Sequence, residues 1–112
     1  EVTDLKYDGA FTVSAAAASA QRPFPTEGHT VELLYIKNTG LNASGETSDG
    51  LVFGTWHNVT VDNDDDAIFA LHSGESILVH PARNNTYPTG SQIYVWLRSG
   101  SAVVIEVLFD AP

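Results

Sequence analysis

The residues best suited to chemistry lie in an acidic run at positions 62–66 that reads Asp-Asn-Asp-Asp-Asp. Asp62, Asp64 and Asp66 alternate like the first oxygen ligands of an EF-hand calcium loop. The match then ends, because Ala67 stands where that loop needs a glycine. Two interpretations stay open: an oxygen-ligand calcium site of another kind, or a solvated turn, which Asp and Asn favour through hydrogen bonds to their own backbone.

Catalytic chemistry has no support elsewhere in the chain. It has no cysteine, which excludes disulfides, thiol catalysis and Cys-ligated metals. The four histidines show no His-x-His or His-x-x-x-His spacing, so a zinc site would need three of them to converge in space. No Gly-x-Ser-x-Gly elbow is present, and spacing alone does not test for the paired carboxylates of a glycosidase. We therefore expect a protein that is not an enzyme and that binds no cofactor.

A second group of candidate residues is aromatic and basic. Tyr94, Trp96 and Arg98 alternate along one apolar segment, so an extended strand would place them on one face. Val104 and Leu108 of the next segment would join them on this face. Tyrosine, tryptophan and arginine are enriched at binding hot spots. This face is either a surface for a partner or one that a second sheet or a loop of the same domain covers. Trp56 and Phe24 complete the set of candidate contact residues.

Length and charge limit the partners. A chain of 112 residues fits one domain with a single core. With 14 acidic against 5 basic residues, its net charge is −9 at pH 7. Nucleic acid and anionic membrane surfaces need the opposite balance, so we expect neither as a partner.

The last third of the chain predicts two hairpins. Apolar segments at 67–71 and 76–80 flank one glycine turn, and segments at 92–98 and 102–109 flank another at Gly100. A three-residue loop in the second hairpin would bring the apolar residues of both its segments onto one core face, whereas a two-residue loop would put them on opposite faces. We therefore expect a positive φ at the glycine of this loop.

Earlier segments add further strands. Residues 30–38 carry β-branched and aromatic types on both faces and predict a central strand that is covered on both sides. Residues 51–62 predict a strand region with a bulge or bend at Gly54. About seven or eight short strands with regular turns indicate an all-β fold, a single antiparallel β-sandwich or jelly-roll-like domain.

The first 29 residues differ from the rest. Asp8-Gly9 favours a hairpin turn, and residues 13–20 are rich in alanine. A short helix and an extended segment both fit this stretch, and we favour the extended form because no apolar stripe accompanies the alanines. We expect an N-terminal hairpin and extended arm at 1–29, packed on a β-sandwich core at 30–112.

Three motifs carry a resemblance to a known family: Asn38-Thr39-Gly40 after an apolar strand, Leu71 with Gly74-Glu75-Ser76 in a turn, and Ser99-Gly100 in the last hairpin. Together they resemble small β-sandwich virion proteins of tailed bacteriophages, of the capsid decoration or head accessory type. The resemblance implies a non-enzymatic structural protein on the capsid surface that stabilises the phage head. Its implied partners are the capsid protein and copies of itself in a homotrimer. The N-terminal arm and the aromatic face would lie across the junctions between shell subunits.

A carbohydrate-binding or lectin-like β-sandwich module is the alternative. In such a module Trp56, Tyr94 or Trp96 would stack on a sugar ring, and the acidic turn would hold calcium. It predicts an exposed aromatic side chain beside carboxylates, whereas the virion function predicts a flat apolar contact surface.

Overall fold

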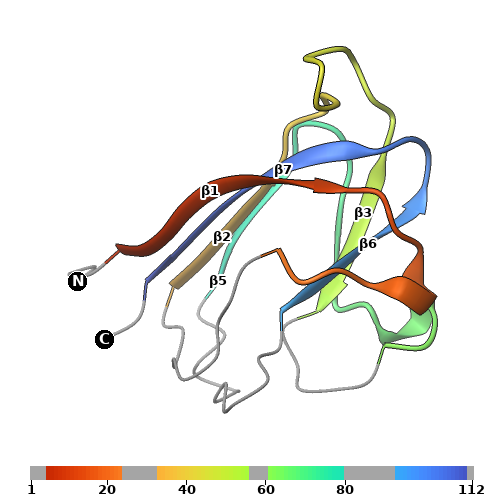
Figure 1. The fold of residues 1–112 in the computed structure, drawn as a ribbon. Coiled ribbons are helices and arrows are strands. Elements are labelled where there is room, and N and C mark those ends of the chain that lie inside the picture. The colour runs from red at the N-terminus through yellow and green to blue at the C-terminus, as the bar shows by residue number, and fades with distance from the viewer. Residues whose placement is uncertain (1–4, 24–32, 56–60, 80–92, 111–112) are drawn as a thin grey trace.

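The computed structural model describes residues 5–23, 33–55, 61–79 and 93–110, with the backbone alone for 5–8 and 110. In these ranges seven strands form two antiparallel sheets that pack face to face, so the predicted all-β sandwich is confirmed (Figure 1). The strands are β1 (Leu5–Val13), β2 (Leu33–Asn38), β3 (Leu51–Thr55), β4 (Phe69–Leu71), β5 (Ser76–Val79), β6 (Tyr94–Ser99) and β7 (Val103–Asp110). The described segments also contain two 3-10 turns, η1 (Ala17–Ser19) and η2 (Asp64–Asp66).

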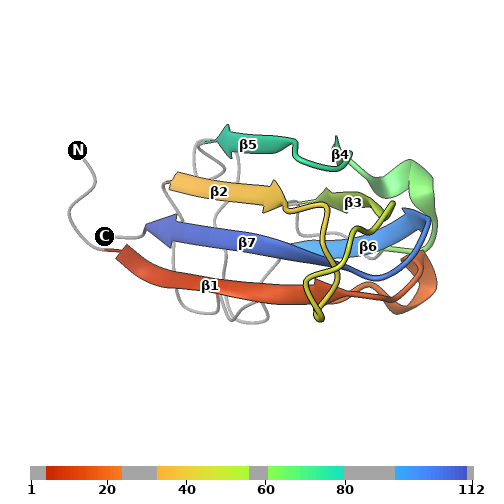
Figure 2. The same cartoon turned by 90° about the horizontal axis from the view of Figure 1, so that it is seen from above.

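The strand order is jelly-roll-like. One sheet has the order β1-β7-β2-β5 and the other the order β4-β3-β6 (Figure 2). Gln21 forms an isolated antiparallel bridge with Val95 of β6, which adds the position of a further strand to the second sheet. When that position is counted, the described residues supply the eight strand positions, divided between two sheets, that a jelly roll requires.

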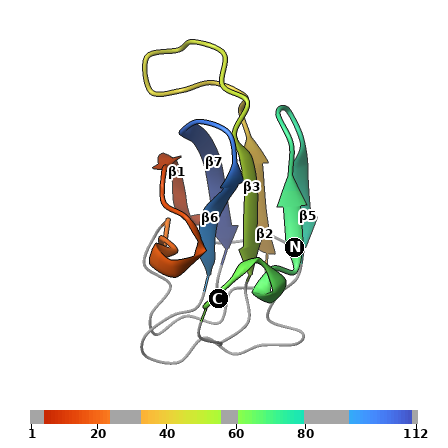
Figure 3. The same cartoon turned by 90° about the vertical axis from the view of Figure 1, so that its right-hand side faces the viewer.

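Three connections between named strands cross from one sheet to the other at the same end of the sandwich, in addition to the connection from β1 to Gln21 (Figure 3). They join β2 to β3, β4 to β5 and β6 to β7, so the two predicted C-terminal hairpins are wrong. Instead β4 and β6 both pair with β3, β5 pairs with β2, and β7 lies between β1 and β2. The alternation of apolar residues could not exclude this arrangement, because a strand that crosses to the facing sheet points its apolar residues into the same core. The predicted positive φ is confirmed at Gly100, where it is 82°.

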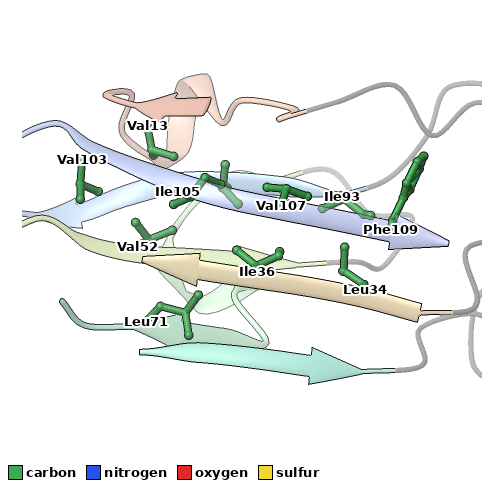
Figure 4. Close-up of a cluster of buried hydrophobic side chains, with 11 residues drawn as sticks. Val13, Leu34, Ile36, Val52, Leu71, Ile93, Val103, Ile105, Val107 and Phe109 are labelled. Carbon is green, nitrogen blue, oxygen red and sulfur yellow. The ribbon is translucent and has the colours of Figure 1, made fainter. Parts of the chain in front are cut away.

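Alternating residues from both sheets fill the space between them (Figure 4). β2 turns Leu34 and Ile36 inward, and neither has exposed surface. Its outward residues, Leu33, Tyr35 and Lys37, are only partly covered, so the expected cover on both faces of this strand is incomplete. The other members of the buried cluster are Val13, Val52, Leu71, Ile93, Val95, Val103, Ile105, Val107 and Phe109. Burial of these apolar side chains is the main favourable contribution to folding.

The predicted N-terminal turn at Asp8-Gly9 is wrong. β1 runs through it without a break, and Gly9 lies opposite Val107 of β7. This longer pairing brings Phe11 and Val13 to the core, which explains why it is preferred over a hairpin. The alanine-rich stretch contains the single turn η1 and no α-helix. The expected boundary between residues 29 and 30 lies outside the described residues.

The irregularity in β3 does not occur at Gly54. The register shifts between Leu51 and Val52, whereas Gly54 is a regular ladder residue opposite Phe69 and Val95. A Cβ atom at Gly54 would collide with the Phe69 ring. Glycine is therefore needed there for close approach rather than for a bend.

The side chain of Asn38 joins two of these crossings, the one from β2 to β3 and the one from β4 to β5. It has no exposed surface. Its Nδ2 donates to the carbonyl oxygens of Gly50 and Leu71, both at 2.9 Å, and its Oδ1 accepts from the N–H of Gly40 at 2.9 Å. These partners belong to the start of β3, the end of β4 and the chain leaving β2, so one amide connects three segments.

The backbone of Asn38 and the side chain of Ser48 extend this network. The N–H of Asn38 donates to the Glu75 carbonyl at 2.9 Å, within the crossing from β4 to β5. Ser48 Oγ donates to the Ala102 carbonyl at 2.7 Å, in the crossing from β6 to β7. Buried backbone groups need such partners, because an unpaired one costs about as much as a lost hydrogen bond.

We expect Asn38→Ala to lower the free energy of unfolding by about 2–4 kcal/mol, because it leaves several buried polar groups without partners. Urea denaturation measures this change. Asn42→Ala, an amide substitution in the exposed part of the loop between β2 and β3, is the control and should cost less than about 1 kcal/mol. Equal losses in both variants would contradict the role of Asn38.

Candidate functional site

The centre of the predicted aromatic face is covered by another segment of the same chain, η2. Trp96 has no exposed surface. Its indole Nε1 donates to Oδ1 of Asp64 in η2 at 2.8 Å, and the Phe53 ring packs edge-on against it at a centroid distance of 6.5 Å. Trp96 is therefore not available to a partner. Its position fits the alternative in which a loop of the same domain covers this face.

Arg98 holds the same aspartate. Its Nε lies 3.2 Å from Oδ2 of Asp64, and both side chains are partly exposed. Both carboxylate oxygens of Asp64 are thus engaged by β6, which fixes η2 on the outer face of the three-stranded sheet. Tyr94, on the same strand, is half-buried. The other predicted contact residues, Trp56 and Phe24, lie outside the described residues.

The acidic run folds into η2 and caps its own backbone. Asn63 Oδ1 accepts from the Asp65 N–H at 2.8 Å, and Asp66 Oδ2 accepts from the N–H groups of Asp62 at 2.8 Å and of Asn63 at 3.2 Å. These two backbone hydrogen bonds lower the pKa of the Asp66 carboxyl. Asp62, Asp64 and Asp66 do not converge on a metal position, and within the described ranges no three His, Asp or Glu side chains do so. The arrangement is that of a capped turn.

His72 is the one histidine whose position is described, because His29, His57 and His80 lie outside the described residues. It is exposed, and its Nδ1 lies 3.0 Å from Oε1 of Glu75. The same carboxylate accepts from the His72 backbone N–H at 2.7 Å, and this bond, followed by the side-chain contact, lowers the pKa of Glu75. The pair closes the turn between β4 and β5.

A shallow depression lies beside η2. It is open to solvent, has a volume of about 440 Å³ and is lined by Phe53, Asp64, Asp65, Ala67, Ile68, Phe69 and Ala70. Five of its seven lining residues are apolar, and the other two carry carboxylates. Asp64 is already engaged by Trp96 and Arg98, so Asp65 is the acid with which the depression could contact a ligand.

The outer face of the four-stranded sheet carries a different apolar surface. We use the name contact face for five apolar residues on it, of which Leu78 is exposed and the other four are half-buried: Leu33, Tyr35, Leu78, Val104 and Leu108. Leu78 is 63% exposed, the highest value among the large hydrophobic side chains of the described residues. Tyr35 lies opposite both Leu78 and Leu108, so these three form a continuous row across three strands, which Figure 2 shows side by side.

The sequence predicted Val104 and Leu108 as members of a contact surface, but it grouped them with the aromatic residues of β6 because it placed β7 beside β6 rather than beside β2. The sequence nevertheless contained a signal for a second apolar surface, because β2 and β7 each have apolar residues at both inward and outward positions. Only one of the two sets can face the core.

In the described part of the chain, no helix has both the length and the apolar character needed to cross a membrane.

We expect Asp64→Ala to loosen η2 and expose the indole of Trp96, because the substitution removes its acceptor and the partner of Arg98. In a Trp56→Phe background, the emission of Trp96 should shift to longer wavelength and acrylamide should quench it more strongly. Asp65→Ala in the same background is the control and should leave both properties unchanged. Unchanged emission in Asp64→Ala would show that η2 does not depend on this carboxylate.

The Asp66 carboxyl should contribute to acid sensitivity. Because its pKa is lower in the folded state than the unfolded value of about 3.9, it stabilises the fold above that value, and the contribution is lost as pH falls through the lowered pKa. Asp66→Asn should therefore weaken the dependence of unfolding free energy on pH below about pH 4. Urea titrations at several pH values measure it, with Asp65→Asn as the charge-matched control. The same pH dependence in both variants would refute the assignment.

Comparison of the chain with protein-family models, with curated proteins and with solved structures finds no match.

Proposed function

We propose that the chain is a non-enzymatic virion structural protein, a capsid decoration or accessory module that binds and stabilises the head of a tailed bacteriophage. It would lie on the capsid surface, with the capsid protein and copies of itself as partners. The observation that carries this proposal is the contact face, an apolar row on a four-stranded sheet in which Leu78 is 63% exposed. Contiguous exposed apolar surface on a globular domain marks an interaction site.

The strand order supports the same proposal. Jelly rolls occur among viral capsid proteins and among lectins, although a fold class does not fix a function by itself. The three motifs that resemble phage proteins, around Asn38, Gly74 and Gly100, lie in the three crossings. The feature common to this chain and the phage virion proteins that it resembles would therefore be the way in which the connections join the two sheets.

The mechanism would be burial of the contact face within the assembly, against the shell or against another subunit. Removal of apolar surface from water contributes roughly 25 cal/mol per Å². Because many copies bind one particle, a modest affinity for each copy suffices. The net charge of −9 would keep decorated particles apart in solution.

The carbohydrate-binding alternative has less support. Trp96 is buried and cannot stack on a sugar ring, and the acidic turn uses its oxygens for the backbone, Trp96 and Arg98. Tyr94 is half-buried and Trp56 lies outside the described residues.

We expect Leu78→Lys to weaken binding to capsids of the virus that encodes the chain by at least about tenfold, because a charge would enter the apolar row. Cosedimentation of the full chain with capsids measures this effect. Ile68→Lys is the matched control: Ile68 is 40% exposed but lines the depression beside η2, away from the contact face. Unchanged binding of Leu78→Lys, or calcium-dependent glycan binding by a monomer, would contradict the proposal.

A further inference from the structure

A pair of opposite charges lies at the centre of the four-stranded sheet. Next to the apolar row, Glu106 of β7 lies opposite Lys37 of β2, and these are the two central strands. Both side chains point outward, because their neighbours Ile36 and Ile105 are buried. The centre of this face therefore presents one charge of each sign, although the chain as a whole has a net charge of −9.

We propose that a second copy of this chain covers the contact face, with the two four-stranded sheets packed face to face about a two-fold axis. The axis runs parallel to the strands, above the boundary between β2 and β7. It places β2 of one copy opposite β7 of the other, and each residue keeps its height along the strand direction. Glu106 then faces the partner's Lys37, and Lys37 faces the partner's Glu106. In the adjacent row, Tyr35 faces the partner's Leu108, while Leu78 extends over the partner's β1.

Charge complementarity favours a second copy over another partner. A two-fold interface uses the same patch on both subunits, so the patch must complement itself. A face with Lys and Glu on the two strands that the axis exchanges meets this condition. The apolar row supplies the affinity, and the two cross-pairs fix the register more than they add free energy.

The shape of the molecule offers enough area. Its principal extents are 36 × 29 × 17 Å, so it is a slab with two broad sides. A standard protein interface needs about 800 Å² from each partner, which is of the same order as one broad side. On the other broad side, η2 already covers Trp96.

This inference deepens the proposed function by naming what covers the contact face, and in that respect it rests on it. It also replaces the homotrimer that the resemblance implies with a two-fold pair. The pair would present two copies to the capsid at once, which raises the effective affinity of each.

Sedimentation equilibrium of the full chain tests the inference through a charge exchange. Wild-type protein should show twice the 12.0 kDa mass of one chain. Lys37→Glu and Glu106→Lys should each lower self-association at least about tenfold, because like charges then face each other twice. An equimolar mixture of the two variants should restore the pair, since each charge again meets its opposite. If each substitution acted only within its own chain, for example by disturbing its fold, mixing the two variants could not restore the pair.

Two further variants complete the test. Glu46→Lys makes the same charge change as Glu106→Lys on an exposed loop, so it should keep the wild-type mass. Leu78→Lys, on the edge strand, should be monomeric even if the variants at Lys37 or Glu106 fail to fold by circular dichroism. Wild-type protein that is monomeric at about 1 mM, a three-chain mass, or folded variants that do not pair when mixed would overturn the inference. A monomer that still binds capsids would refute the pair alone, and a pair that does not bind them would refute the proposed function alone.

Discussion

The buried amide of Asn38 is the interaction on which the rest of the structure depends. A sandwich whose consecutive strands alternate between sheets must turn its chain across the core several times, and each crossing buries backbone N–H and C=O groups. Asn38 satisfies three of them with one side chain, at Gly40, Gly50 and Leu71. Such groups must be paired because burial without a hydrogen bond costs more than the bond itself contributes. The amide thereby fixes how the two sheets are joined at one end.

Fixing the crossings also decides which strands are neighbours. β7 can lie between β1 and β2 only because the chain leaves β6 for the other sheet, at Gly100. The outward residues of β2, β5 and β7 then share one face and form the apolar row. On the opposite side, β6 is left beside η2, and Asp64 closes over Trp96. The two broad sides of the sandwich thus differ, since η2 covers Trp96 on one side, whereas the described residues leave Leu78 exposed on the other.

The sequence predicted the elements better than their partners. Alternation identified most of the strands and the all-β class, and the three-residue loop predicted the φ of Gly100, because both depend on residues close in the chain. Asn38 could not be recognised as a hub, since its partners Gly50 and Leu71 lie 12 and 33 residues away. Likewise Trp96 was a plausible contact residue until its acceptor, 32 residues earlier, was located over it. The local pattern of apolar residues predicts on which face of a strand a side chain lies. The pairing of the strands decides which other residues pack against that face.

We propose that the protein assembles through the contact face of the four-stranded sheet. Hydroxyl-radical footprinting can compare the protein on assembled particles with the isolated chain in dilute solution. We expect reduced oxidation of Tyr35, Leu78 and Leu108 on the particles, with unchanged oxidation of Ile68 beside η2. Protection of Ile68 and Phe53, with Tyr35 and Leu78 still oxidised as in the isolated chain, would contradict this proposal.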